Sequence, residues 1–147
     1  MNLLSDPAVI AINDLILRCQ INAAHHHYTA ELLPAGAAAR FLRGLAADRE
    51  ATAQALSRRL LALGALPEVA DRELDSLHEL GDRLRARLSA HPVAKLLGER
   101  GDDEAALAAA TRHALGARAL EPLHPAIRRL GDDAAACAAH LRALEGG

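Results

Sequence analysis

Aromatic side chains are almost absent from this chain. Its 147 residues include no Trp, one Tyr and one Phe, so aromatic residues make up 1%. The β-branched and aromatic residues that favour strands are scarce, which argues against a fold built on β-sheets. Two arginine pairs, Arg58-Arg59 and Arg128-Arg129, have no aromatic residues interleaved with them for stacking on bases. We therefore interpret both pairs as solvated helix faces.

Charge of one sign and long apolar runs are also lacking. Lys and Arg together number 17 and Asp and Glu 19, which gives a formal net charge of -2. This balance provides neither a basic footprint for nucleic acid nor a basic face for a membrane surface. No apolar stretch reaches the ~18–20 residues of a transmembrane helix, and residues 1–7 lack the positive region of a signal peptide. We expect no nucleic-acid partner and no membrane partner.

Cysteine is sparse as well. The two cysteines, Cys19 and Cys137, are too few for a disulfide framework. Both fall in helical patterns, so we expect reduced thiols and a cytoplasmic location. The bias towards Ala, Arg and Leu is typical of a bacterial protein encoded by a GC-rich genome.

Apolar residues without a branch at Cβ are abundant instead. Hydrophobic residues make up 51% of the chain, and most of them are Ala and Leu, which favour helices. A chain of this length buries roughly 70% of its unfolded surface when it folds. We predict an all-α protein with one domain over residues 1–147, packed closely through small side chains.

Two long amphipathic segments occupy the first half of the chain. The first is predicted to begin at Ser5-Asp6-Pro7 and to end at Pro34-Ala35-Gly36, and the second to end at Gly64. The first segment has an inward stripe of Ile12, Leu15, Cys19, Asn22 or Ala23, His26, Ala30 and Leu33. The second has an inward stripe of Phe41, Leu45, Asp48, Thr52, Leu56, Leu60 and Leu63. The short loop between them predicts an antiparallel helical hairpin.

A second hairpin is predicted in the last third of the chain. Gly101-Asp102-Asp103-Glu104 is expected to open its first helix, with acidic residues at the positive end. Pro122 and Pro125 mark a corner, and a last helix covers residues 126–144 with Cys137 turned inward. Residues 71–89 form a further amphipathic segment in the connection between the hairpins. Two antiparallel hairpins joined by a long crossover with a short extra helix make a ferritin-like four-helix bundle.

Five short motifs spread over nearly the whole chain carry a family resemblance. They are Asn13-Asp14-Leu15-Ile16 followed by Cys19, Phe41-Leu42-Arg43-Gly44-Leu45-Ala46, Asp48-Arg49, Leu63-Gly64-Ala65-Leu66-Pro67 and Gly101-Asp102-Asp103-Glu104-Ala105. In order and spacing they resemble an uncharacterised bacterial family of ferritin-like four-helix-bundle proteins, known as a domain of unknown function. The resemblance implies a ferritin-like fold and, by analogy, a dimetal centre, although no activity is established for the family.

The chain departs from this family where a dimetal site needs its ligands. The family tends to carry a glutamate near position 23 and an aromatic residue near 26, where this chain has Ala23 and His26. It tends to carry a glutamate near 48 and an acidic residue near 111, where this chain has Asp48 and Thr111. A di-iron site also needs Glu-x-x-His on two helices, and the only such sequence here, Glu121-Pro122-Leu123-His124, is broken by proline.

Three consecutive histidines, His25-His26-His27, lie inside the first predicted helix. Successive residues of a helix point about 100° apart, so the three cannot share one face. We expect His26 to face the core, with His25 and His27 at the surface or at an interface. A core-facing histidine needs a hydrogen-bond partner or a ligand, so His26 is predicted to pair with Asp48, with a buried water or with a metal.

A thiolate–imidazole metal site is the alternative that the remaining ligands allow. Cys137 and His140 have the i, i+3 spacing of a helix-borne ligand pair, and His26 and Asp48 are expected at a similar height in the bundle. The candidate metal ligands are therefore His26, Asp48, Cys137 and His140, with Cys19 nearby, for zinc, copper or iron. In the competing, structural interpretation the buried cysteines act as small hydrophobic residues and His140 lies at the solvent edge.

These observations lead to three functional hypotheses. The first is a non-catalytic bundle with a degenerate dimetal site that acts as a binding or interaction module and self-associates as a dimer. The second is a metal-binding protein that uses the four candidate ligands. The third is a ferroxidase-like di-iron enzyme with an unusual ligand set. We favour the first because the glutamates and the Glu-x-x-His pairs of a di-iron enzyme are missing.

Overall fold

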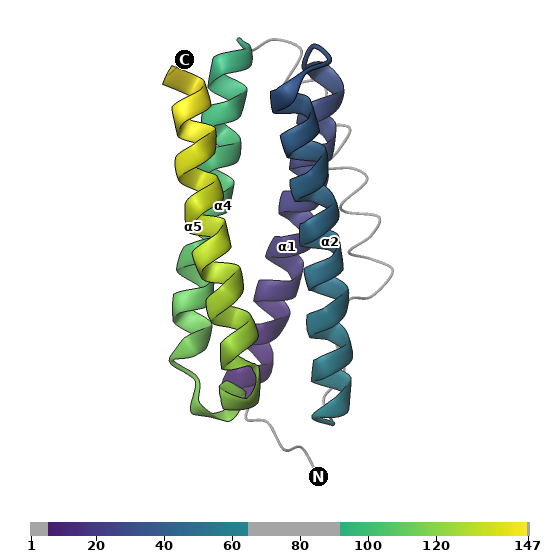
Figure 1. The fold of residues 1–147 in the computed structure, drawn as a ribbon. Coiled ribbons are helices and arrows are strands. Elements are labelled where there is room, and N and C mark those ends of the chain that lie inside the picture. The colour runs from purple at the N-terminus through teal and green to yellow at the C-terminus, as the bar shows by residue number, and fades with distance from the viewer. Residues whose placement is uncertain (1–5, 65–91, 147) are drawn as a thin grey trace.

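The protein is built from long α-helices. The computed structural model describes residues 6–64 and 92–146. These ranges contain α1 (Asp6–Leu32), α2 (Ala37–Ala62), α4 (Val93–Leu115), a short 3₁₀ helix η1 (Arg118–Leu123) and α5 (His124–Gly146) (Figure 1). No β-strand occurs among these residues, so the all-α prediction is confirmed for them. The extra helix predicted over residues 71–89 lies outside the described residues.

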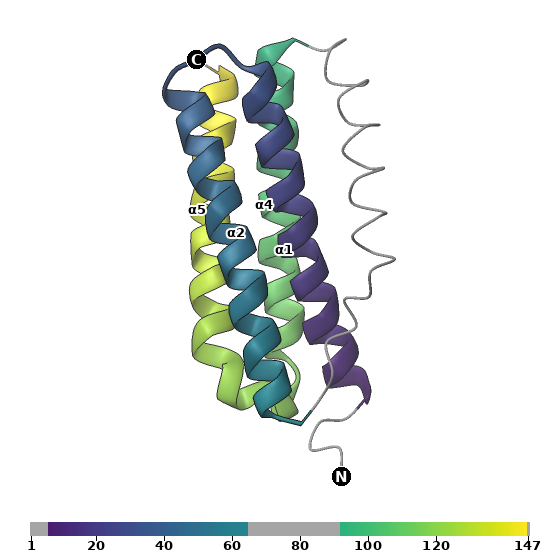
Figure 2. The ribbon, with the colours of Figure 1, turned by 90° about the vertical axis from the view of Figure 1, so that its right-hand side faces the viewer.

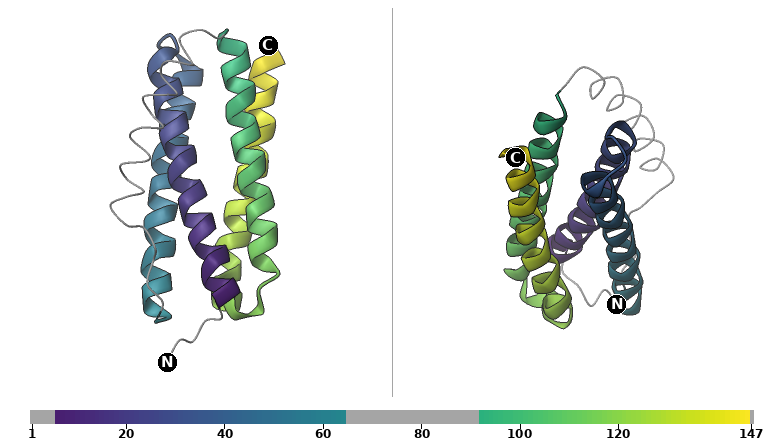
Figure 3. Two further views of the ribbon diagram at one scale, coloured as in Figure 1. Left: turned by 180° about the vertical axis from the view of Figure 1, so that it is seen from behind. Right: turned by 45° about the horizontal axis from the view of Figure 1, so that its top comes forward.

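The four long helices form two antiparallel hairpins that pack side by side. α1 packs against α2 and α4, and α4 packs against α5. α1 and α5 run in one direction and α2 and α4 in the other, as the colours in Figure 1 show, and all four extend lengthwise together in Figure 2. α2 and α5 lie towards the viewer in Figure 1, whereas Figure 3 brings α1 and α4 to the front. Within residues 6–64 and 92–146, no helix combines the length and apolar character that crossing a bilayer requires.

The helix α4 begins earlier than the sequence predicted. Its first residue is Val93, directly after Pro92, so Gly101 and Glu104 lie inside the helix and not at its start. Glycine inside a helix costs about 1 kcal/mol relative to alanine, but Gly101 permits a close approach of α5. A Cβ atom at Gly101 would lie 3.3 Å from the backbone oxygen of Ala138. The prediction that Gly101 opens the helix is therefore wrong, and Glu104 lies in the bundle interior.

The inward face of α2 differs from the predicted stripe at one position, where the buried residue is the next one along the helix. Leu45, Leu56 and Leu60 are buried as predicted, but Asp48 is exposed and Arg49 is buried in its place. One residue along a helix corresponds to a rotation of about 100°, so Asp48 points away from the core that Arg49 enters. The prediction that Asp48 faces the core is wrong.

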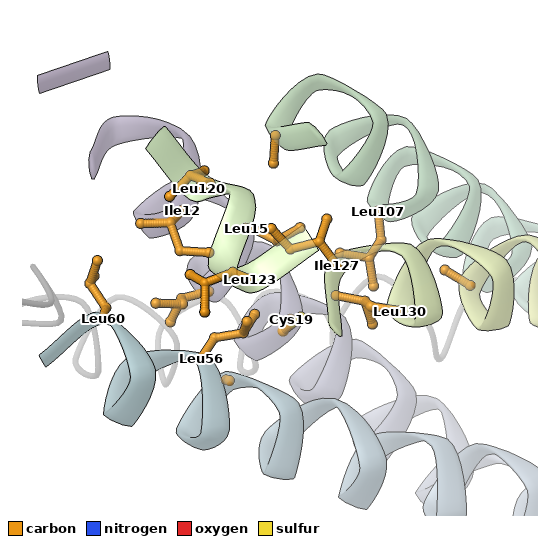
Figure 4. Packing of buried hydrophobic residues seen from close by; sticks show 14 of the residues in the cluster. Ile12, Leu15, Cys19, Leu56, Leu60, Leu107, Leu120, Leu123, Ile127 and Leu130 are labelled. Carbon is orange, nitrogen blue, oxygen red and sulfur yellow. The ribbon is translucent and has the colours of Figure 1, made fainter. Parts of the chain in front are cut away.

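Apolar packing is divided into two clusters, one towards each end of the bundle. The larger cluster, drawn in Figure 4, includes Ile12, Leu15, Cys19, Leu56, Leu60, Leu107, Leu120, Leu123, Ile127 and Leu130. The smaller one includes Ala30, Leu33, Ala39, Leu42, Leu45, Leu97 and Leu141. Along α1, α2 and α4, buried polar residues fall between the two clusters, and we call Glu104 and the three that surround it the polar layer: Asn22, His26, Arg49 and Glu104 itself. This layer is the most unusual feature of the interior, because charged residues are almost never buried without a partner.

Candidate functional site

A buried ion pair lies at the centre of the polar layer. The side chains of Glu104 on α4 and Arg49 on α2 are 0% and 2% exposed. Nε of Arg49 donates to Oε1 of Glu104 at 3.0 Å, and Nη2 donates to the same oxygen. Each group compensates the charge of the other in an interior that neither could enter alone without a large desolvation cost.

The second oxygen of Glu104 is engaged by α1. The side-chain amide of Asn22 donates to Oε2 at 2.9 Å, and Nε2 of His26 lies 3.1 Å from the same atom. The Asn22 amide also donates to the backbone oxygen of Asp103 at 3.1 Å. Both carboxylate oxygens of Glu104 are therefore surrounded by nitrogen donors from α1 and α2.

Arg49 connects this buried pair to the surface through α5. Its Nη2 lies 2.9 Å from Oδ2 of Asp133, whose side chain is 54% exposed. Each long helix thus contributes one ionisable side chain, and we call these four the charged cluster: His26, Arg49, Glu104 and Asp133. One guanidinium lies between two carboxylates at mid-bundle, where the sequence had predicted metal ligands.

A second polar set joins α1 to α4 next to the charged cluster. Nη1 of Arg100 donates to Oγ1 of Thr29 at 2.9 Å, and both residues are buried. Nε of Arg100 lies 2.9 Å from Oδ2 of Asp103, and Nδ1 of His25 lies 2.8 Å from the same oxygen. The contact between the two hairpins is therefore polar at this height as well.

Burial and hydrogen bonding oppose each other at the buried carboxyls. Desolvation by burial raises the pKa of Glu104, but hydrogen bonds from His26 and Arg49 and the charge of Arg49 together hold that pKa below its usual value. Desolvation likewise raises the pKa of Asp103, and His25 and Arg100 outweigh it and lower the pKa overall. Both groups are carboxylates at neutral pH.

His26 is neutral in this environment. Burial lowers its pKa more than the hydrogen bond and the charge of Glu104 raise it. A neutral imidazole that donates from Nε2 to Glu104 has no proton on Nδ1. Nδ1 is buried and has no hydrogen-bond partner in the described part of the chain. His26 is therefore a hydrogen-bond donor to Glu104 and not a second counter-ion.

Both thiols are protonated at neutral pH. Burial raises the pKa of Cys19 to about 12, and burial together with the charge of Asp133 raises the pKa of Cys137 to about 11. Cys19 is fully buried in the larger apolar cluster, whereas Cys137 is half-buried with its Sγ 3.9 Å from Oδ2 of Asp133. Neither sulfur is a preformed thiolate of the kind that binds soft metals.

The four predicted metal ligands are not gathered into one group. His26 is buried against Glu104, Asp48 is exposed, Cys137 is half-buried, and His140 is exposed with its ring 4.6 Å from that of Phe41. Over residues 6–64 and 92–146, no three His, Cys, Asp or Glu side chains form a group that could hold a metal ion. A metal site on these four residues stays a prediction, with no preformed group behind it.

The histidine run divides as helical geometry requires. His26 faces the core, His25 is half-buried against Asp103, and His27 is exposed with its Nε2 3.2 Å from Oε1 of Glu31. The one Glu-x-x-His sequence ends at His124, the first residue of α5, whose Nε2 lies 3.1 Å from the backbone oxygen of Ala117. It takes no part in the charged cluster.

The charged cluster does not fit a dimetal centre. Such a centre needs several carboxylates and imidazoles with free lone pairs turned to a common cavity. Here the oxygens of Glu104, the one fully buried carboxylate in the described ranges, are already engaged by Arg49, Asn22 and His26. The Arg49 guanidinium supplies the positive charge that a metal ion would otherwise supply.

Sequence reasoning missed Arg49, Arg100, Glu104 and Asp133. The burial of Glu104 was not predicted, because a helix that begins at Gly101 has Glu104 in its first turn, where an acidic side chain is favoured by the helix dipole. The signal that could have found it is the spacing of Leu97, Glu104 and Thr111, which repeats every seven residues and matches one inward face. Arg49 is not a metal-ligating residue type, whereas the adjacent Asp48 is.

A groove lies between α2 and α5, the two helices that lie towards the viewer in Figure 1. Its volume is about 510 Å³. It is lined by Asp48, Arg49, Ala51, Thr52, Ala55, Leu56, Arg59, Ala126, Arg129, Leu130 and Asp133. Two members of the charged cluster, Arg49 and Asp133, therefore line a recess that opens to solvent.

Comparison of the chain with protein families, with curated proteins and with solved structures finds no match. The family resemblance drawn from the sequence motifs therefore stays a prediction. The functional argument rests on the charged cluster and on the groove beside it.

Proposed function

We propose that this chain is a non-catalytic bundle of the ferritin-like class whose dimetal position is taken by its own charged side chains, and that it acts as a binding or interaction module. The observation that carries the proposal is the state of Glu104. This central carboxylate is fully buried, and its two oxygens receive hydrogen bonds from Arg49, Asn22 and His26. A carboxylate held in this way has no lone pair directed at an open coordination site.

The course of the helices supports the ferritin-like part of the proposal. α2 and α4, which are consecutive among the long helices described, run in the same direction. A chain that joins two parallel helices must travel the length of the bundle between them, as the crossover of a ferritin-like bundle does. The placement of one ionisable side chain from each long helix at mid-height is also the arrangement in which such bundles hold metal ligands.

Metal analysis tests this proposal directly. The protein is purified without a tag, analysed for zinc, copper and iron, and unfolded thermally with and without each added metal. We expect no stoichiometric metal and an unchanged unfolding midpoint, because a bound metal at a hundredfold excess over its Kd would add about 2.7 kcal/mol of stability.

The variants His26→Ala and His140→Ala separate the proposal from the metal-binding alternatives. Stoichiometric zinc or copper that is lost in both variants would overturn the proposal in favour of a thiolate–imidazole site. Bound iron with oxygen-dependent absorbance would overturn it in favour of a ferroxidase-like enzyme. Self-association as a dimer belongs to the same proposal and is measured by sedimentation velocity on the untagged protein.

A further inference from the structure

We propose that the groove between α2 and α5 binds a fatty-acid-like monocarboxylate, with its head between Arg59 and Arg129 and its apolar body over Leu56 and Leu130. This inference rests on the proposed function, because it names the ligand class of the binding module. It starts from the two arginine pairs of the sequence, Arg58-Arg59 and Arg128-Arg129, because the two members of each pair lie in different surroundings in the structure.

Only one arginine of each pair lines the groove. Arg59 on α2 and Arg129 on α5 lie on its opposite walls, whereas Arg58 and Arg128 are exposed elsewhere on the same helices. In the described part of the chain, neither Arg59 nor Arg129 has a hydrogen-bond or ion-pair partner. Two unpaired guanidinium groups on opposite walls of one recess suit a carboxylate between them, because the planar fork of arginine matches the two oxygens of a carboxylate.

The middle of the groove is apolar. Leu56 and Leu130 are buried core residues that form part of its floor, and alanines on both walls leave room beside them: Ala51, Ala55 and Ala126. The volume of about 510 Å³ is typical of sites that hold small organic ligands. An alkyl chain attached to the carboxylate can cover these leucine and alanine side chains and so exclude water from them.

Two aspartates also line the groove. Asp133 lies four residues after Arg129 on α5, about 6 Å along the helix, and is paired with the buried Arg49. Asp48 is eleven residues before Arg59 on α2, which corresponds to about 16 Å along the helix. A second carboxylate at the far end of a ligand would meet Asp48, so the groove favours a single anionic head over a dicarboxylate.

Titration with decanoate, below the concentration at which it forms micelles, tests the proposal. Binding is measured by calorimetry and by the methyl shifts of Leu56 and Leu130 in NMR spectra. We expect saturable one-to-one binding with shifts at both leucines. Decanedioate, which has the same length and a second carboxylate, is expected to bind about tenfold more weakly.

The chain offers a charge-matched control. The double variant R59A/R129A is expected to weaken decanoate binding at least about tenfold, because each guanidinium contributes a charge-assisted hydrogen bond. The double variant R58A/R128A removes the same charge from the same helices and is expected to bind within about twofold of the parent.

Several outcomes would overturn the proposal. One is the absence of saturable binding, and another is an equal loss in the two double variants. A third is a dimer that dissociates only in R59A/R129A, because a second copy of the chain would then fill the groove. A fourth is binding to vesicles that contain phosphatidylglycerol but not to decanoate, which would assign the arginines to lipid headgroups. Failure here without any bound metal leaves the proposed function intact, whereas bound metal removes that function whatever decanoate does.

Discussion

Arg49 is a permanently charged side chain that is buried between the two apolar clusters. Its neighbours, Glu104 and Asp133, raise its pKa above the usual value despite the desolvation that burial imposes. A buried ion pair is close to neutral for stability relative to an apolar pair of similar shape, but removal of one partner leaves an uncompensated charge. The pair is therefore expected to add little to the free energy of unfolding, whereas the loss of one partner is expected to lower that free energy strongly.

Replacement of Glu104 by glutamine is expected to lower the free energy of unfolding by about 3–5 kcal/mol, since it leaves the buried guanidinium of Arg49 without its main partner. Urea denaturation monitored by circular dichroism measures this loss. The double variant R49M/E104L removes both charges and is expected to recover most of it.

The exposed pair between Arg18 and Asp14 provides the control, with its nitrogen–oxygen distance of 3.1 Å. Replacement of Arg18 by alanine is expected to cost less than about 1 kcal/mol, because exposed pairs are screened by solvent. A similar small loss for Glu104→Gln would contradict the central role of the buried pair.

The free energy of unfolding is expected to decrease in two steps as the pH is lowered. The pKa of His26 is lowered in the folded state, so the unfolded chain takes up a proton first, and stability decreases as the pH falls below 6.5, the usual pKa of histidine. The pKa of Glu104 is also lowered, from 4.5, so a second decrease follows as the pH falls below 4.5. Each proton contributes a slope of at most about 1.4 kcal/mol per pH unit.

Unfolding curves at a series of pH values measure these steps. The variant His26→Gln is expected to lose the first step, because its amide can still donate to Glu104 but does not titrate. The variant His27→Gln should retain it, since His27 is exposed on the same helix. An unchanged profile in His26→Gln would show that the titration arises elsewhere. His26 faces Glu104, Asp103 and Arg100 on α4. The pKa values of Glu104 and Asp103 are lowered from their usual acidic values, so neither carboxyl titrates near pH 6.

At the scale of a single helix, the sequence predicted α1 and α5 well and α2 and α4 less well. The stripe from Ile12 to Leu33 on α1 is buried as expected because every position on it except Asn22 and His26 is apolar. On α2, periodicity alone does not distinguish Asp48 from Arg49 as the buried residue, because the two positions are adjacent in an alanine-rich helix. Only a partner on another helix, here Glu104, identifies the residue that is buried.

The close contact between α4 and α5 depends on glycine. Replacement of Gly101 by leucine is expected to destabilise the protein by about 1–3 kcal/mol, since the added side chain overfills the contact with Ala138 and Arg142. Gly44 on α2 is the matched control, because a Cβ atom there has nothing within 4 Å. Leucine at Gly44 is expected to stabilise the helix by up to about 1 kcal/mol. Equal urea midpoints for the two variants would contradict a glycine-dependent contact.

At the scale of the whole molecule, the composition of the chain and the prolines and glycines that end its helices were sufficient to predict helical hairpins. Pro34 to Gly36 ends α1, and Pro122 and Pro125 mark the turn into α5, as local chemistry requires. The charged cluster could not be predicted in the same way, because its members lie on four helices and become neighbours only after the hairpins pack. Its position between two apolar clusters also limits how the hairpins can slide, since a shift by one helical turn would bury Glu104 without Arg49.

The pairing of Arg49 with Glu104 also constrains how descendants of this protein can change. Loss of either residue alone passes through an unstable intermediate, so the two are expected to be exchanged together or not at all. Relatives of this chain should therefore carry both residues or neither, and a lineage with a metal-ligating carboxylate at position 104 should lack arginine at position 49. A change towards a metal centre at this position would thus cross a barrier of protein stability, because it must first dismantle the pair of Arg49 and Glu104.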